Sequence, residues 1–138
     1  MMSSSTASLF AEPPVVLADT GTVMAALKTI RVTKAGLQET ELHDDVCAAL
    51  AKAKITYRRE YSFGPRCRAD VWVEGIVIEV KKQRPARAKL LAQLLRYAEQ
   101  PQVRAIVLVL ERSVPVPPEI EGKPVFVVSL NALWGIAL

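Results

Sequence analysis

The chain lacks any long uninterrupted apolar run, although hydrophobic residues make up 51% of its 138 residues. Because a membrane-spanning helix needs roughly 18 apolar residues in succession, this apolar content must instead fill the core of a globular domain. We therefore expect no membrane partner. The length is enough for one domain with a substantial core and too short for two well-packed ones.

The first twenty residues contain no lysine or arginine. They therefore lack the basic start that export and mitochondrial leaders need. Serine and proline cluster there instead, in "MMSSSTASLFAEPPVVLADT". We interpret residues 1–20 as a flexible N-terminal arm of a cytoplasmic protein, and residues 21–138 as a single domain.

Cysteine is also scarce, with only Cys47 and Cys67 in the chain. Two cysteines so far apart do not form a zinc knuckle, and they are too few for a disulfide framework or a four-thiolate cluster. We expect both to be buried, reduced thiols.

Positive charge is concentrated in one stretch of the chain. Residues 54–89 contain ten basic and four acidic residues, a net charge of +6, whereas the whole chain carries +4. This imbalance suggests a surface for a polyanion such as nucleic acid. A solvated cationic surface without a partner is the alternative.

The hydrophobic spacing predicts an α/β fold. Apolar residues recur every three or four positions over residues 37–54 and again over 84–100, as in amphipathic helices. β-Branched and apolar runs predict strands over 55–63, 67–73, 76–82, 103–111 and 125–130. A short first helix near 22–32, a proline-rich loop over 112–124 and a short helix or tail at 131–138 complete the chain. The predicted order is α-β-β-β-α-β with a C-terminal β-α extension, in a mixed sheet flanked by helices.

The strands predicted over 67–73 and 76–82 bring two carboxylates together. If residues 74–75, "EG", form a two-residue hairpin loop, Val71 pairs with Ile78 and Asp70 with Glu79. Directly opposed residues have Cβ atoms about 4.5 to 5.5 Å apart on the same face of the sheet. We therefore expect the two acids to stand side by side.

Opposed like charges among apolar neighbours require a compensating cation. Mg²⁺ prefers carboxylate oxygens and water, and it leaves positions free for substrate phosphate. Lys81 follows Glu79 by two residues and should lie on the same face. The alternative is a structural network in which Arg68 and Lys81 merely neutralise the acids.

The first amphipathic helix offers two further candidates. Glu39 lies three residues before Leu42, so it falls on the buried stripe and can point toward the sheet. His43, the single histidine of the chain, lies one turn from Glu39 and could contact the same site as an accessory residue. A histidine satisfied within the surface or core is the alternative.

These residues together resemble the PD-(D/E)XK nuclease superfamily, which has a restriction-endonuclease-like fold. The resemblance rests on Glu39 in a helix, then Asp70, then "EVK" at Glu79–Lys81, and it covers about residues 36–110. "QLLRY" is similar to the Q-x-x-x-Y signature of the RecB-like branch, which implies that Gln93 and Tyr97 lie beside the site or on DNA. The proline that gives the superfamily its name is replaced by alanine, and the four cysteines of iron–sulfur branches are missing.

The resemblance implies metal-dependent phosphodiester hydrolysis. Asp70, Glu79 and the carbonyl of Val80 would hold Mg²⁺, for which Mn²⁺ would substitute, with Glu39 as a further ligand. Lys81 would orient or deprotonate the attacking water. Basic residues just beyond the strand would bind flanking phosphates: Lys82, Arg84, Arg87 and Lys89.

The expected function is therefore that of a Mg²⁺-dependent deoxyribonuclease, with RNA left open as a substrate. No candidate recognition helix is evident, so we expect a preference for nucleic-acid structure or ends rather than for a long sequence. A Holliday-junction-resolvase-like enzyme would act as a homodimer. The alternatives are an inactive nuclease fold that serves as a nucleic-acid-binding or regulatory module, and an assembly protein whose acids form a structural ion network.

Overall fold

The structure is a computed structural model that describes residues 18–31 and 39–130. Its elements, in chain order, are α2 (Thr20–Leu27), α3 (Glu39–Lys52), β1 (Arg58–Gly64), β2 (Cys67–Val73), β3 (Ile76–Lys81), α4 (Arg87–Ala98), β4 (Ala105–Leu110), β5 (Glu119–Ile120) and β6 (Lys123–Ser129). The predicted order of two helices and four strands from α3 to β4 is confirmed.

The six strands form one mixed sheet in the order β1-β2-β3-β4-β6-β5. β1, β2 and β3 are antiparallel, whereas β4 runs parallel to both β3 and β6. A parallel neighbour cannot be reached by a tight turn, and α4 makes the crossover from β3 to β4. The prediction of a meander joined to a strand entered through a helix is confirmed.

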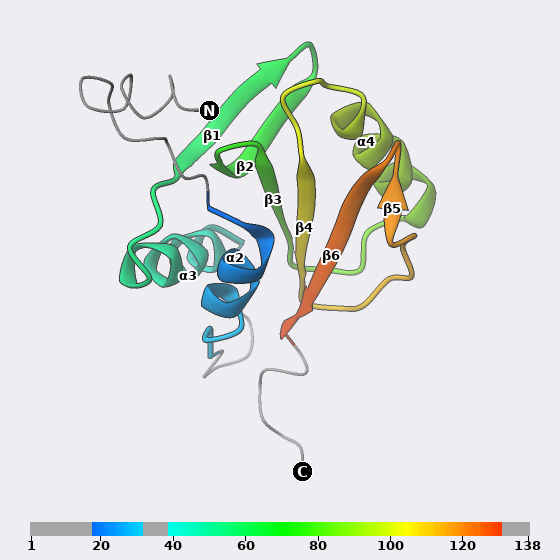
Figure 1. The fold of residues 1–138 in the computed structure, drawn as a ribbon. Coiled ribbons are helices and arrows are strands. Elements are labelled where there is room, and N and C mark those ends of the chain that lie inside the picture. Colours follow the sequence, from blue (N-terminus) through cyan, green and yellow to red (C-terminus); the bar gives the residue numbers. More distant parts are fainter. Residues whose placement is uncertain (1–17, 32–38, 131–138) are drawn as a thin grey trace, which may run out of the picture.

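Helices cover the sheet on both faces (Figure 1). α2 and α3 pack on one face over alternate residues of the central strands, among them Val71, Ile78 and Val107. α4 packs on the other face, where Leu94 meets Leu108 and the remaining members of a second apolar cluster. β4 is buried along its whole length, as expected for a strand covered on both sides.

The hairpin between β2 and β3 turns through Glu74 and Gly75. Both have positive φ angles, 47° and 97°, which is the combination that a two-residue type I′ turn requires. The ladder pairs Val71 with Ile78, so the register predicted from the "EG" loop is confirmed for the first three pairs. This register brings residue 70 and residue 79 to the open end of the hairpin.

Four further predictions concern the loop over 112–124, the two ends of the chain, the cysteines and membrane-spanning helices. The loop predicted over 112–124 contains the short strand β5, whose two residues pair with the start of β6. Most of the predicted arm and the tail at 131–138 lie outside the described residues. Both cysteines are buried and free, as predicted. None of the helices within 18–31 and 39–130 has the length and apolar character needed to cross a membrane.

Candidate metal centre at the open end of the hairpin

Asp70 lies where strand β2 changes the face that it presents. Ala69 belongs to the apolar cluster beneath α4, whereas Val71 belongs to the cluster beneath α2 and α3. In a regular strand these two residues would share a face. The neighbouring strand is irregular at the same level, because Glu60 of β1 has a left-handed φ of 51°. Because of this irregularity, the Asp70 side chain does not follow the alternation between the two faces of the sheet that a regular strand would impose.

Asp70 and Glu79 are linked through backbone groups of the opposite strand. The backbone N–H of Asp70 donates to Glu79 Oε1 at 3.1 Å, and that of Val80 donates to Asp70 Oδ2 at 2.8 Å. The two carboxylates, which the sequence had placed side by side on one face, reach toward different helices. Asp70 reaches His43 of α3, whereas Glu79 reaches Gln93 of α4. The difference follows from the face change in β2.

Both carboxyl groups are perturbed by their surroundings. Burial, followed by the nearby charge of Asp70, raises the pKa of Glu79 from 4.5 to about 8. Burial also raises the pKa of Asp70, and the Val80 N–H, His43 and Lys81 oppose that rise. Lys81 lowers and Glu39 raises the pKa of both acids, so the two groups belong to one electrostatic site.

Glu39, His43 and Asp70 bring three potential ligand atoms within 4.8 Å of one another. His43 Nε2 lies 3.5 Å from Asp70 Oδ2 and 3.6 Å from Glu39 Oε2. These separations are longer than hydrogen bonds, and Nε2 is buried with no hydrogen-bond partner within the described part of the chain. A buried nitrogen without a partner, aimed at two carboxylates, is a group that a cation would satisfy.

The spacing of the three atoms suits a divalent ion. Two adjacent ligands of an octahedral ion with bonds of about 2.1 Å lie about 3 Å apart. A shift of about half an ångström would bring His43 Nε2 to such a separation from Asp70 Oδ2 and from Glu39 Oε2. One imidazole with two carboxylates suits Mn²⁺ at least as well as Mg²⁺, since Mg²⁺ prefers oxygen ligands more strictly than a transition-metal ion does. Glu79 lies outside this trio, although the sequence had placed the ion between Glu79 and Asp70.

The predicted residues of the second helix and of the "EVK" motif gather around Glu79. Lys81 Nζ lies 3.7 Å from Glu79 Oε2, and Gln93 Nε2 lies 3.5 Å from the same oxygen. Gln93 also donates to the Tyr97 hydroxyl at 3.0 Å, which in turn donates to the Arg68 carbonyl at 2.9 Å. The two residues of the Q-x-x-x-Y pattern therefore border the site, and Gln93 holds the buried acid from the α4 side.

The pKa of Tyr97 is raised to about 12, mainly by burial and then by the charge of Glu79. The hydroxyl therefore stays protonated and acts as a donor. The guanidinium of Arg68 pairs with Glu60 on the exposed side of β1. The Arg68 guanidinium is therefore not paired with Asp70 or Glu79. The alternative in which Arg68 and Lys81 merely neutralise these acids retains only Lys81.

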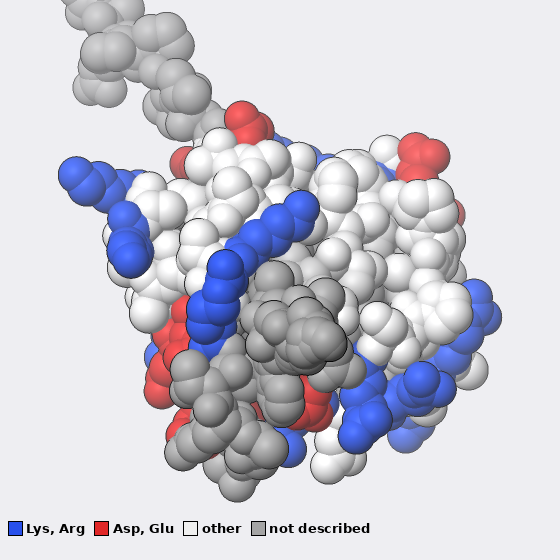
Figure 2. All heavy atoms as spheres, turned by 90° about the horizontal axis from the view of Figure 1, so that it is seen from below, with Lys and Arg blue, Asp and Glu red and all other residues white. Residues whose placement is uncertain are grey.

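The four predicted phosphate-binding residues lie in three different places. A cleft of about 420 Å³ lies on the α3 side of Lys81, where Glu39, Lys82 and Arg84 line it. Lys89 lines a different cleft on the α4 side. Arg87 lines neither of these two clefts, and its Nε donates to the carbonyl of Pro115 at 3.1 Å. Figure 2 shows basic side chains gathered at the lower right of one face, with no acidic side chain among them.

Arg66 and Arg96 were not among the residues that the sequence indicated for the site. His43 was an accessory candidate, and the structure places it between two carboxylates. Arg96 follows Gln93 by three residues and Lys89 by seven, so helical spacing could have placed it on the same edge of α4. Arg66 lies on the turn between the strands predicted over 55–63 and 67–73, and no local pattern indicates that this turn lies beside α4.

Comparisons with known proteins add no assignment. A scan against protein-family models found no match, and searches of curated proteins and of solved structures found no similar protein.

Proposed function

We propose that this protein is a metal-dependent nuclease that hydrolyses phosphodiester bonds, with DNA as the expected substrate. The observation that carries the proposal is the buried, unpartnered Nε2 of His43, aimed at Glu39 and Asp70. Glu79 and Lys81 lie next to this trio at the open end of the same hairpin. A cation-binding trio beside a lysine and a basic surface is a combination suited to phosphate chemistry.

Glu39, His43 and Asp70 would hold the ion, and the predicted participation of Glu79 and of the Val80 carbonyl extends that set. When bound, the ion would supply Lewis acidity and neutralise negative charge that develops on the phosphate. The hydrogen bond from Val80 N–H fixes the Asp70 carboxylate on the side facing α3. The chain thus positions one ligand through its own backbone.

Lys81 would orient or deprotonate the attacking water through Nζ, which a compact amine of adjustable pKa can do and a guanidinium cannot. Its distance of 3.7 Å from Glu79 Oε2 keeps the amine at the edge of the site. Gln93 and Tyr97 act as positioning residues, because their hydrogen bonds hold Glu79 against the sheet.

The fold supports the same proposal. The helix–meander–helix–strand order, with β4 parallel to β3, is the arrangement expected for a restriction-endonuclease-like core. The position of Asp70 and Glu79 on adjacent strands of that core agrees with a RecB-like or Holliday-junction-resolvase-like nuclease. A four-way-junction substrate would require two copies of the chain, so a homodimer forms part of that version of the proposal.

The test is a cleavage assay with labelled single-stranded, duplex, flapped and four-way DNA, and with single-stranded RNA, each in Mg²⁺ and in Mn²⁺. We expect at least one substrate to be cut, and the cleavage to stop in EDTA and in the Asp70→Asn variant. If every substrate stays intact in both metals, or if Asp70→Asn cuts as fast as the native chain, the nuclease proposal is wrong.

One observation favours the second candidate, an inactive nuclease fold that binds nucleic acid or regulates a partner. Asp70 and Glu79 already accept backbone hydrogen bonds across the hairpin, so these acids also serve the fold. Calorimetry with Mn²⁺ distinguishes the two candidates, because only the nuclease requires the ion to bind at the trio. Nucleic-acid binding without metal binding would support the inactive fold.

A further inference from the structure

A second feature borders the proposed site on the α4 side. A cleft of about 480 Å³ lies between α4, the β1–β2 turn and the end of β3. Four cationic side chains line it, together with Gln93, and no acidic residue does: Arg66, Lys81, Lys89 and Arg96. Lys81 and Pro85 line this cleft and also the cleft that contains Glu39, so the two clefts adjoin at these residues.

Three of the four charges of this cleft have no acidic partner among the described residues. Lys81 has Glu79 at 3.7 Å, but the described residues provide no carboxylate in ion-pair contact with Arg66, Lys89 or Arg96. Elsewhere the chain does pair its arginines, as Arg59 does with Asp44 at 3.0 Å. Several like charges around one concave surface repel each other, and an anion in the cleft would relieve that repulsion.

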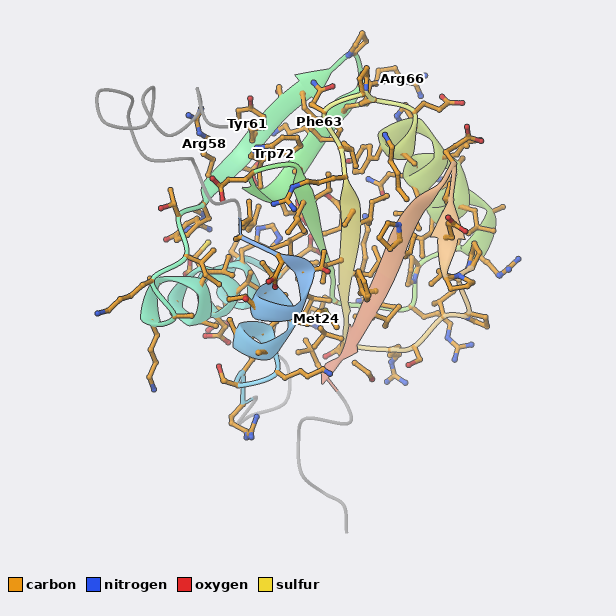
Figure 3. All side chains as sticks on the ribbon, in the orientation of Figure 1. Met24, Arg58, Tyr61, Phe63, Arg66 and Trp72 are labelled. Atoms are coloured by element: carbon orange, nitrogen blue, oxygen red, sulfur yellow. The ribbon has the colours of Figure 1, made fainter. Side chains whose placement is uncertain are left out.

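Parts of the cleft are held in place before any ligand binds. Arg96 Nε donates to the carbonyl of Arg66 at 2.9 Å, which leaves the terminal nitrogens of Arg96 available. The guanidinium carbon also lies 5.8 Å from the centre of the Tyr97 ring. Arg66 has a left-handed φ of 58° at the tip of its turn, which Figure 3 shows near α4. The turn and the helix thus form a common cationic wall.

We propose that this cleft binds a phosphate group of the substrate strand next to the phosphate that is cleaved, with Arg66, Lys89 and Arg96 as its contacts. The proposal rests on the proposed nuclease function and states how the strand passes the site. The strand runs from the cleft beside Glu39, across Lys81, into the cleft beside α4. Its phosphate is either an internal phosphodiester or a terminal phosphomonoester, and both present the same anionic oxygens.

The experiment measures binding without cleavage. Fluorescence anisotropy in EDTA gives the affinity of a labelled single-stranded oligonucleotide at several salt concentrations. The test variant is the double substitution Arg66→Gln and Lys89→Gln, which leaves the structural contact of Arg96 intact. The matched control is Lys28→Gln with Lys52→Gln, which removes the same charge near α2 and α3, away from the cleft. Circular dichroism and thermal unfolding verify that both variants fold.

We expect the cleft variant to bind the oligonucleotide about tenfold or more weakly than the native protein does. The slope of log affinity against log salt should become shallower by about one for each basic residue removed. The control should change affinity by less than about twofold. If both variants lose affinity equally, the effect is one of net charge alone and the cleft proposal is wrong. An unchanged affinity and slope in the cleft variant overturns it as well.

Three oligonucleotides identify the phosphate. A loss of affinity confined to a 5′-phosphorylated strand, compared with its 5′-hydroxyl form, supports a terminal phosphomonoester. An equal loss that extends to circular single-stranded DNA supports an internal phosphodiester. Because these binding measurements are made without metal, they do not depend on cleavage. If the cleft variant loses affinity but the native protein cuts no substrate, only the nuclease proposal is wrong. If the variant binds and cleaves as the native protein does, only the cleft proposal is wrong.

Discussion

The backbone N–H of Asp70 donates a hydrogen bond to the carboxylate of Glu79 at 3.1 Å, where the regular ladder between β2 and β3 ends. Beyond the last backbone pair of the ladder, hydrogen bonds from backbone N–H groups to the Asp70 and Glu79 carboxylates join the two strands. The same acids are the ones that the sequence placed at a metal site. Structure and proposed chemistry therefore depend on one pair of residues, and substitutions must be chosen to separate the two.

Glu79→Gln should separate them. The amide retains an oxygen that can accept the hydrogen bond from Asp70, and it is neutral, as the buried acid is when its pKa is about 8. We expect the variant to stay folded near pH 7 without metal, at least as stably as the native chain, but to lose metal-dependent cleavage by about 100-fold or more. Glu119→Gln on exposed β5 is the matched control. Retained cleavage in Glu79→Gln would remove this acid from the mechanism.

Stability without metal should depend on pH in a direction set by Glu79. A raised pKa means that the folded state keeps its proton while the unfolded chain loses it. The stability that Glu79 contributes is therefore greatest below pH 4.5, falls as pH rises toward 8, and changes no further above that. Burial gives Asp70 a contribution of the same sign. Urea unfolding in EDTA at pH 5 and pH 8 measures the effect.

Glu79→Gln should flatten this dependence, since the variant has no proton to lose at residue 79. At pH 8 we expect the variant to be more stable than the native chain, by an amount on the order of a few kcal/mol. At pH 5 the two should be closer. A native chain whose stability rises between pH 5 and pH 8 in parallel with the variant would contradict the assignment.

His43 should decide metal binding. We expect His43→Ala to weaken Mn²⁺ binding by about tenfold or more in calorimetry, because a ligand is lost, and to weaken Mg²⁺ binding less. Removing a buried imidazole also leaves a cavity, so His43→Asn provides a polar variant with less change in volume. If both variants bind Mn²⁺ as the native chain does, His43 is not a ligand.

Lys81→Ala should lower turnover more than affinity for nucleic acid. The cationic cleft retains three other basic residues, whereas the amine near Glu79 has no replacement. Lys81→Arg keeps the charge and loses the adjustable proton, so it should restore binding but not turnover. Single-turnover cleavage and anisotropy measured on the same variants distinguish the two effects. Full turnover in Lys81→Arg would limit this residue to binding phosphate.

The turn that sets the hairpin register can be tested through Gly75. A Cβ there would lie 2.9 Å from both the Gln102 carbonyl and Arg104 Cγ, and φ is 97°. We expect Gly75→Ala to destabilise the fold by about 1 to 3 kcal/mol. Gly122 has φ of 75° with nothing within 4 Å of its Cβ position, so Gly122→Ala measures the backbone strain alone. Equal losses in the two variants would show that the close approach at Gly75 is unimportant.

The fold was largely predictable because its determinants are local. Alternating apolar residues and the "EG" turn specify the hairpin register, and the spacing of Leu42, Val46 and Leu50 specifies α3. β5 was not predicted, because a strand of two residues has no detectable periodicity and forms only by pairing with β6.

The geometry of the site was less accessible. The prediction assumed a regular strand at Asp70, whereas backbone-to-carboxylate hydrogen bonds and the irregular Glu60 turn the side chain toward α3. Such bonds join residues that are distant in the chain, and no residue pattern encodes them. The central place of His43 depends on this turn, so the sequence could only suggest it as an accessory.

Glu79 is the register partner of Leu108 in the parallel ladder between β3 and β4, near the middle of the sheet. In the proposed nuclease, a group embedded there has almost no freedom to adapt to different substrates. Arg66 on its turn and Arg84 on the segment before α4 are attached to elements that can vary in length and composition at little cost to the sheet. Substitutions that alter the substrate choice of the proposed nuclease should therefore be tolerated at the rims of the sheet and not at its centre.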